Sequence, residues 1–181
     1  MLKLINSLVP FFEDCYGRIN VREYARAVKI TPPTAAKILL KFNKEGLLKK
    51  EYFKNYHFYY ANKDSKDFVD LSHIYWRMKL QNLTSSLKAE LIAPTIVLFG
   101  SLAKAEVKQD SDVDLAIFSN ENEFFPEKFE KELKRKIQVF FFPAIESIKS
   151  KELANNILNG FVLEGRLWIG KNVIQKELLK K

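Results

Sequence analysis

Two short polar segments in the second half of the sequence could hold a phosphorylated ligand together with a metal ion. Gly100 and Ser101 directly follow the apolar run 95–99, and Asp112 and Asp114 open a second apolar run that ends at residue 118. We predict that both runs are strands. Residues two apart in a strand project to the same face, so the two aspartates would lie side by side. Two neighbouring carboxylates repel each other unless a cation lies between them, and Mg²⁺, or Mn²⁺ in its place, takes such oxygen ligands along with substrate phosphates.

The Gly100-Ser101 pair suits the phosphates of that ligand. Glycine allows a close approach to the backbone, and a turn that leads into a helix, expected here over 103–108, offers backbone N–H groups to an anion. The serine adds a hydroxyl group. One strand end would therefore hold phosphates and the neighbouring strand a metal ion. That arrangement suits attack on an α-phosphate, in which metal ions stabilise the attacking and the leaving oxygen.

The segment 100–115, Gly-Ser-Leu-Ala-Lys-Ala-Glu-Val-Lys-Gln-Asp-Ser-Asp-Val-Asp-Leu, resembles the signature of the DNA polymerase β superfamily of nucleotidyltransferases. Within it, the segment is most similar to the minimal nucleotidyltransferase branch, over about residues 91–170. The resemblance implies that Gly100, Ser101 and Lys104 bind an NTP, and that Asp112 and Asp114 are catalytic and bind Mg²⁺. It also implies transfer of AMP from ATP to an acceptor hydroxyl on a protein or another substrate. Members of this branch often act as antitoxins of a HEPN-type toxin partner, which the family alone suggests here.

The sequence departs from the family pattern at two positions. Ala105 stands where the family usually has glycine, and we expect this departure to be mild, because alanine suits a helix. Gln138, in the predicted strand 137–142, stands where the family has a third carboxylate. A neutral amide cannot act as a base near neutral pH, although its carbonyl oxygen can still bind a metal ion. The alternative to an active enzyme is therefore a DNA-binding regulator with a degenerate, non-catalytic nucleotide-binding domain. A third hypothesis is an antitoxin that only masks a surface of its partner.

The elements around these residues predict an α/β (α+β) domain over 91–181, with a small mixed sheet flanked by helices. We expect helices over 124–136 and 145–158, and closing strand segments over 161–163 and 167–169. Residues 63–90 show helical spacing of apolar residues, and we predict one linker helix there. That helix either packs on both neighbouring domains or forms the seam of a homodimer.

The N-terminal third carries most of the positive charge. The whole chain has a net charge of +8, of which residues 1–62 hold +6 and the segments 63–90 and 91–181 hold +1 each. This asymmetry indicates a polyanionic partner for the N-terminal third. Helical patterns over 2–13, 21–29 and 31–45 precede two aromatic-rich runs that flank Lys54 and Asn55 as a β-hairpin. The arrangement resembles winged helix-turn-helix regulators over 1–62, which implies binding to double-stranded DNA.

The helix 31–45 would be the recognition helix of such a domain. It follows Thr31 as a cap and Pro32 at its first position, and it has an apolar face and a cationic face. The alternative is an ordinary amphipathic helix with solvated lysines. We predict base contacts from the start of the helix and phosphate contacts from the lysines. The predicted DNA-binding residues are Pro33, Thr34, Lys37, Lys41, Lys44, Lys49 and Lys50.

Other features limit the cellular setting. Cys15 is the single cysteine and cannot form an internal disulfide, which favours a reducing compartment and a packed thiol. No apolar run approaches the ~18–20 residues of a membrane span, and the start lacks the pattern of a signal peptide. We therefore expect a cytoplasmic protein without a membrane partner.

Overall fold

The computed structural model describes residues 2–120 and 123–168. The chain forms two compact units. The N-terminal unit comprises Met1–Met78 together with Lys104–Ser111, and the C-terminal unit comprises Lys79–Ala103 together with Asp112–Lys181. Among the described residues, every helix is too short or too polar to cross a membrane.

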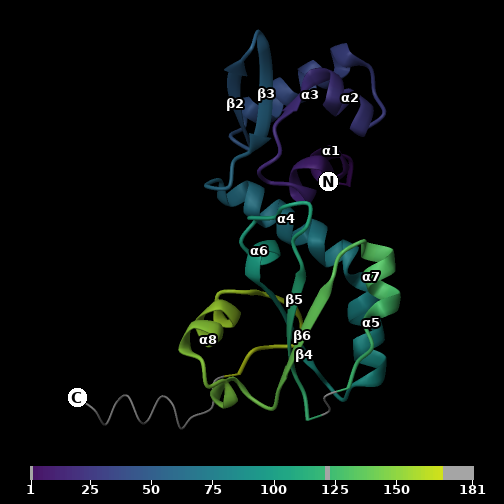
Figure 1. Cartoon of the computed structure of the whole chain (residues 1–181), viewed down its shortest axis with the longest axis vertical. Coiled ribbons are helices and arrows are strands. Elements are labelled where there is room, and N and C mark those ends of the chain that lie inside the picture. Colours follow the sequence, from purple (N-terminus) through teal and green to yellow (C-terminus); the bar gives the residue numbers. More distant parts are fainter. Residues whose placement is uncertain (1, 121–122, 169–181) are drawn as a thin grey trace, which may run out of the picture. The chain divides into compact units, whose positions relative to one another are not determined.

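The N-terminal unit combines helices with a three-stranded antiparallel sheet (Figure 1). The sheet has the order β1-β3-β2, so the short first strand pairs with the second strand of the hairpin. This is the succession of three helices and a hairpin that the sequence predicts for a winged helix-turn-helix. The elements in chain order are α1 (Leu2–Glu13), β1 (Ile19–Asn20), α2 (Val21–Ala27), α3 (Pro32–Lys44), β2 (Leu48–Phe53), β3 (Tyr56–Ala61) and α4 (Lys66–Lys79).

Local signals explain where these elements begin. The Asn20 side chain accepts hydrogen bonds from the backbone of Arg22 and Glu23, and the Glu23 side chain accepts one from the Asn20 N–H, which makes a capping box at α2. Lys54 and Asn55 have positive φ values of 44° and 65°, as a tight hairpin turn requires. Thr31 precedes α3, but its hydroxyl bonds to the Thr34 hydroxyl instead of capping the backbone.

Large aromatic side chains form the core of this unit, as the phenylalanine content suggests. Phe12 packs on the rings of Phe68 and Tyr75, at centroid distances of 5.2 Å each. The Tyr24 hydroxyl donates a hydrogen bond to the Ser7 carbonyl, so α1 and α2 are linked by a polar as well as an apolar contact. Side chains from α1, α2, α3 and α4 are fully buried here, among them Leu8, Phe11, Tyr24, Leu39, Phe68 and Trp76.

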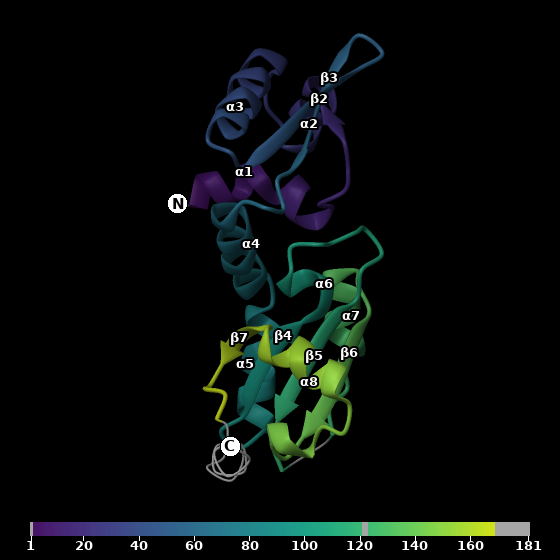
Figure 2. The ribbon, with the colours of Figure 1, turned by 90° about the vertical axis from the view of Figure 1, so that its left-hand side faces the viewer.

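The C-terminal unit is a four-stranded mixed sheet with helices on both faces, which confirms the predicted fold class. The strand order is β6-β5-β4-β7, with β5 parallel to β6 and the other pairs antiparallel. Helix α8 lies on one face of the sheet, and α5 and α7 lie on the other (Figures 1 and 2). The elements are α5 (Gln81–Glu90), β4 (Thr95–Phe99), α6 (Gly100–Ala103), β5 (Val113–Phe118), α7 (Glu127–Leu133), β6 (Ile137–Phe142), the 3₁₀ helix η1 (Ile145–Ser147), α8 (Lys151–Leu158) and β7 (Phe161–Glu164).

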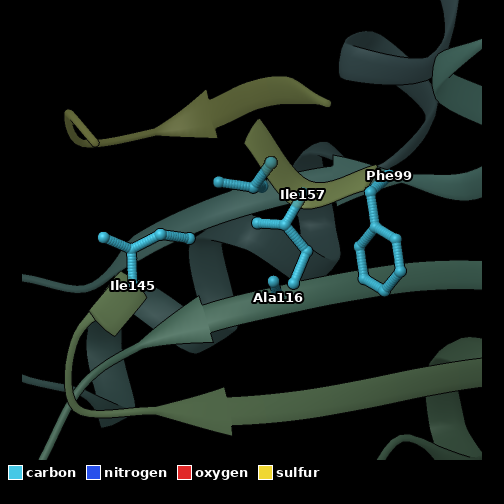
Figure 3. Packing of buried hydrophobic residues seen from close by; sticks show 5 residues of the cluster. Phe99, Ala116, Ile145 and Ile157 are labelled. Carbon is cyan, nitrogen blue, oxygen red and sulfur yellow. The ribbon is translucent and has the colours of Figure 1, made fainter. Parts of the chain in front are cut away.

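An apolar cluster fixes α8 and η1 to the sheet. Phe99 and Ala116 contribute from the strands, Ile145 from η1 and Ile157 from α8, and their side chains gather over one face of the sheet (Figure 3). All four are less than 9% exposed. Because Phe99 and Ala116 belong to the two strands that end or begin beside Gly100 and Asp112, this cluster also holds the candidate site in place.

Several predicted helices have other bounds in the structure. The predicted linker helix 63–90 is two helices, α4 and α5, because the backbone at Leu80 (φ −89°, ψ 5°) leaves the helical region. Leu80 is fully buried, so the apolar pattern continues across a break that periodicity cannot reveal. The helix predicted from residue 103 begins instead at Gly100 and ends at Ala103.

The later predictions need similar corrections. The predicted helix 124–136 is the shorter α7, which ends at Leu133 and is followed by Lys134 in a left-handed conformation. The predicted helix 145–158 is η1 followed by α8, whose start is capped by the Ser150 hydroxyl. The first predicted closing segment is β7, whereas residues 167 and 168 are not in a strand. Ile169 and the rest of the predicted domain to residue 181 lie outside the described residues.

Candidate functional site

Asp112 and Asp114 lie at the start of β5, as the sequence predicts. Asp114 belongs to the strand, whereas Asp112 immediately precedes it and is not part of it. Both aspartates are partly exposed, while the alternate residues Val113 and Leu115 are buried. This alternation places the two carboxylates on the side of β5 that faces away from the buried pair, as a period of two requires.

Gly100 directly adjoins the carboxylate of Asp114. Its neighbour Phe99, the last residue of β4, pairs in register with Asp114. Gly100 itself has a φ of +71°, a left-handed conformation that other residues rarely adopt. A Cβ on this residue would overlap Asp114 Oδ2 and would lie 3.1 Å from Asp114 Cγ. Two properties of glycine are therefore needed here: its backbone freedom and its lack of a side chain.

Gln138 lies beside both aspartates. It pairs with Asp114 in the parallel register of β5 and β6, so it occupies the position where the family pattern has a carboxylate. Its Nε2 donates a hydrogen bond of 2.6 Å to Asp112 Oδ2. The amide thus binds an oxygen that a metal ion would otherwise use, and it supplies a neutral donor where a third carboxylate would add negative charge.

The electrostatics of the site reflect its apolar surroundings. Burial, and as a second cause the negative charge of Asp112, together raise the pKa of Asp114 to about 6. Apolar residues lie nearby, since Phe99 pairs in register with Asp114 and its ring lies 5.6 Å from that of Phe140 on β6. Desolvation and a like charge both disfavour the ionised form of a carboxyl group, and a bound cation would favour it again.

The residues present fit one divalent cation. Asp112 and Asp114 provide two adjacent carboxylates, and a bound cation would offset both the burial and the like charge that raise the pKa of Asp114. Gln138 could add its amide oxygen if the side chain turned over, because its nitrogen now faces Asp112. Within the described ranges, no group of three or more His, Cys, Asp or Glu side chains is placed to hold a metal ion. A metal here would therefore depend on two protein carboxylates and on the substrate phosphates.

The remaining residues of the predicted nucleotide site lie on and after α6. Ser101 is partly exposed in α6, next to Gly100. Lys104 is exposed and belongs to the segment 104–111, which is part of the N-terminal unit. Within that unit, the Val107 carbonyl accepts a 2.8 Å hydrogen bond from the backbone N–H of Cys15.

Ala105 corrects one expectation from the sequence. It lies beyond the end of α6 and adopts a left-handed φ of 52° while its side chain is fully buried. A helix is therefore not what the position requires, and alanine carries a backbone cost that glycine would avoid.

A cavity of the C-terminal unit lies away from this site. This cavity of about 280 Å³ lies at the opposite end of the sheet, where β4 begins and β5 and β6 end. Thr95, Phe118, Pro143 and Trp168 are among its lining residues, and none of the candidate residues is. The carboxylate pair is partly exposed at the start of β5, and its assignment depends on residue chemistry.

The predicted recognition helix α3 presents the expected two faces. Ala35, Leu39 and Phe42 are buried, and Leu40 is 42% exposed beside the cationic residues. All five predicted α3 contacts are exposed: Pro33, Thr34, Lys37, Lys41 and Lys44. Lys41 forms a weak pair with Glu45, at 3.7 Å between solvent-exposed atoms, which leaves it available to another anion.

Lys49 and Lys50 lie on opposite faces of the hairpin. Lys50 shares the face of Leu48 and Tyr59, which are buried, whereas Lys49 lies on the other face and bonds to Asp64 at 2.5 Å. The structure therefore does not bring these two lysines together on one surface.

A second cationic surface was missed by the sequence reasoning. Arg22 and Arg26 of α2 line hollows of about 400 and 610 Å³ together with Pro32 at the start of α3, and Lys29, just after α2, lines the larger one. The first hollow also reaches His57 of the hairpin. The spacing of four residues places Arg22 and Arg26 on one face of α2, and this signal was present in the sequence.

Comparison with known proteins identifies the class of the C-terminal unit. Residues 81–166 match the family described as "Polymerase beta, Nucleotidyltransferase". The matched segment contains the mixed sheet, Gly100 and both aspartates. The match supports a polymerase β-like nucleotidyltransferase domain in this part of the chain.

Two solved structures show only distant similarity. The chain has 12% identity and a TM-score of 0.39 to MepR, a transcription regulator of the Staphylococcus aureus multidrug efflux pump MepA, covering 50% of this chain and 64% of the regulator. It has 14% identity and a TM-score of 0.31 to human N-acetylserotonin methyltransferase in complex with SAM, covering 49% of this chain and 29% of the enzyme. TM-scores this low support no conclusion about fold or function. No curated protein matches the sequence significantly.

Proposed function

We propose that the C-terminal unit transfers a nucleoside monophosphate, AMP from ATP, to an acceptor hydroxyl on a protein or another substrate. The observation that carries this proposal is the pair Asp112 and Asp114 beside Gly100, inside the segment that matches the nucleotidyltransferase family. That family generally uses an NTP and a divalent metal. Mg²⁺ is the metal we propose, because it binds carboxylates and substrate phosphates together.

Each residue has a role in this proposal. The two aspartates hold the cation, and Gly100 leaves space for the Asp114 carboxylate and for the phosphates. Ser101, on α6, contacts the phosphates. When bound, the cation stabilises the negative charge that develops on the phosphate oxygens during transfer. Gln138 orients Asp112 through its hydrogen bond but cannot remove a proton from the acceptor.

Label transfer from α-labelled ATP in the presence of Mg²⁺ tests this function. We expect wild-type protein to label an acceptor in a cell extract, and Asp112→Ala to abolish the labelling. Asp110→Ala is the matched control, because Asp110 is an exposed aspartate two residues earlier and should be dispensable. Equal labelling by wild type and Asp112→Ala would refute the assignment of the site.

A second candidate function is nucleotide binding without catalysis, in a DNA-binding regulator. The hydrogen bond from Gln138 to Asp112 favours it, since the amide replaces the expected third carboxylate and binds one of the two that remain. This candidate predicts no label transfer by the wild type and Mg²⁺-dependent ATP binding that Asp114→Ala abolishes. If only Gln138→Asp transfers the label, the wild-type protein binds nucleotide without catalysis, and the active-enzyme proposal fails.

We further propose that the N-terminal unit binds double-stranded DNA through α3. The exposed cationic face of this helix and the +6 charge of residues 1–62 support the proposal. Binding to the promoter of its own gene should weaken as salt rises. A plot of log K against log salt concentration should fall with a slope of ~0.9 for each phosphate contact. Lys37→Ala and Lys41→Ala should each reduce that slope, whereas Lys151→Ala, an exposed lysine of α8, should not. Binding that does not depend on salt would refute the proposal.

The antitoxin role and the homodimer are further hypotheses for the same chain. We propose a HEPN-type toxin as the protein partner, on the family resemblance alone. Co-expression with the product of the neighbouring reading frame, followed by co-purification, tests this pairing. Sedimentation of the purified chain tests the dimer, for which the exposed α4 residues Ile74 and Met78 are the candidate contacts. A monomer that captures no small helical protein would contradict both.

A further inference from the structure

One face of the β1-β3-β2 sheet is turned away from the core of the N-terminal unit. In an antiparallel pair, residues in register point to the same face, and the faces alternate along each strand. Leu48, Tyr59 and Ala61 share one face and are at most 4% exposed. The other face carries the three register pairs Lys49–Tyr60, Glu51–Phe58 and Phe53–Tyr56. We call this second surface the outer face.

Aromatic rings dominate the outer face. Phe53, Tyr56, Phe58 and Tyr60 all lie on it, and successive rings along β3 are two residues apart. Phe53 is 57% exposed and Tyr56 is 56% exposed, which is unusual for such large side chains. They lie beside the turn at the end of the hairpin, which extends beyond α3 in Figure 2. Phe53 and Tyr56 therefore contribute little to the core, and their exposed rings are available to a binding partner.

Cations accompany the rings. The Arg18 guanidinium lies 4.9 Å from the centroid of the Tyr60 ring, and the Lys54 ammonium lies 5.3 Å from that of Phe53. Glu51 is the single acidic member of the three register pairs, and it bonds to Arg18 at 2.5 Å. The outer face therefore combines aromatic rings with positive charges, and the carboxylate among its register pairs is bound to Arg18.

We propose that the outer face binds unpaired bases of single-stranded DNA. A base stacks on an aromatic ring whichever base it is, and neighbouring cations bind the phosphates between bases. Duplex DNA hides the faces of its bases, so exposed rings gain little from it, whereas an opened or overhanging strand can use each of them. An apolar protein partner would not explain the cations that lie over the rings. The choice of DNA over RNA rests on the proposed duplex binding by α3 in the same unit.

Fluorescence anisotropy with a labelled oligothymidylate of about 12 nucleotides tests the proposal, since single-strand sites span roughly 4–16 nucleotides. The full chain should bind this probe more tightly than oligouridylate or a blunt duplex of equal length. Tyr56→Ala and Phe53→Ala should each weaken binding about tenfold, and Tyr56→Trp should restore it, because the ring and not the hydroxyl stacks. Circular dichroism and thermal unfolding of each variant show whether the unit still folds.

The hairpin offers a matched control. Tyr52 is 66% exposed and adjoins the same turn, but it pairs with His57 on the opposite face. Tyr52→Ala should therefore leave oligothymidylate binding unchanged. Equal losses in Tyr52→Ala and Tyr56→Ala would overturn the assignment to the outer face, and so would tighter binding of oligouridylate or no binding at all.

Two further outcomes separate this proposal from its alternatives. Lys37→Ala should weaken duplex binding and leave oligothymidylate binding intact. The duplex probe therefore tests the α3 proposal, and the oligothymidylate probe tests the outer face separately. A self-associating chain that Tyr56→Ala converts to monomers, without oligonucleotide binding, would show that the rings form a protein interface and would overturn the proposal. Competition by unlabelled oligothymidylate against the Tyr56-dependent signal would support it.

Discussion

The contact between Gly100 and Asp114 leads to a quantitative prediction for Gly100→Ala. Alanine at the observed φ of +71° costs about 1–2 kcal/mol relative to glycine, because its Cβ crowds the backbone in the left-handed region. The new Cβ would also overlap Asp114 Oδ2, so the carboxylate must turn away. Metal ligands tolerate deviations of only about 0.2 Å. We therefore expect Mn²⁺ and ATP to bind about 10–100-fold more weakly.

Gly46 separates the two causes. It has a φ of +75°, but nothing lies within 4 Å of a Cβ placed on it. Gly46→Ala should therefore lose the same ~1–2 kcal/mol of unfolding free energy and leave nucleotide and metal binding intact. The part of the Gly100→Ala loss that exceeds the Gly46→Ala loss measures the displacement of Asp114.

Urea unfolding measures the unfolding free energy of each variant. Calorimetric titration with Mn²⁺ and a non-hydrolysable ATP analogue measures its affinity for metal and nucleotide. Unfolding should be followed separately for each unit, because Gly46 belongs to the N-terminal unit and Gly100 to the C-terminal unit. Wild-type affinity for metal and nucleotide in Gly100→Ala, with a stability loss no larger than that of Gly46→Ala, would refute the reasoning. It would mean that the close approach of glycine to the carboxylate does not shape the site.

Three further predictions follow from single residues. Burial raises the pKa of Asp114 to about 6 from 3.8, so between about pH 4 and 6 the folded protein retains a proton that the unfolded chain has lost. Without divalent cations, the unfolding free energy should therefore fall as pH rises through this window, and Asp114→Asn should remove the fall in urea titrations. Burial also raises the pKa of Cys15 to about 11 from 9.0, so at pH 8 its thiol should react with a disulfide reagent about 100-fold more slowly in the folded protein than in urea; comparable rates would contradict this. Ala105→Gly should raise the unfolding free energy by about 0.5–1 kcal/mol, because relief of the left-handed φ of 52° exceeds the loss of one buried methyl group. A lower unfolding free energy in chemical denaturation would show that burial of this methyl group stabilises the fold by more than the left-handed backbone costs.

Much of the fold could be predicted because its signals are local. The apolar run 95–99, the alternation that begins at Asp112 and the turn at Lys54 and Asn55 each specify an element within a few residues, and each element is present. The same signals placed Asp112 and Asp114 on one side of β5. Composition and period were sufficient there because a strand determines the direction of its side chains without help from the rest of the chain.

The errors arose where tertiary structure determines the backbone. Apolar spacing runs through Leu80 without a change, and only the structure shows that its backbone breaks the helix. Alanine at position 105 looked suited to a helix, although the chain adopts a left-handed turn there. The hydrogen bond between Gln138 and Asp112 joins residues 26 positions apart, so it depends on the pairing of β5 and β6, which no local pattern specifies.

The role of Gln138 follows from what a glutamine can and cannot replace. Its position in register with Asp114 maintains the shape of the strand pair, and its hydrogen bond to Asp112 reduces the repulsion that a third carboxylate would increase. The substitution therefore preserves the geometry for a cation and a nucleotide while it removes the group able to accept a proton from the acceptor hydroxyl. An active enzyme would need that proton to pass to the solvent or to a group on the acceptor itself. Transfer should then become faster as pH rises in wild type, because the acceptor must ionise without a protein base, whereas Gln138→Asp should flatten this dependence above pH 7. A flat pH profile in an active wild type would show that another residue of the chain serves as the base.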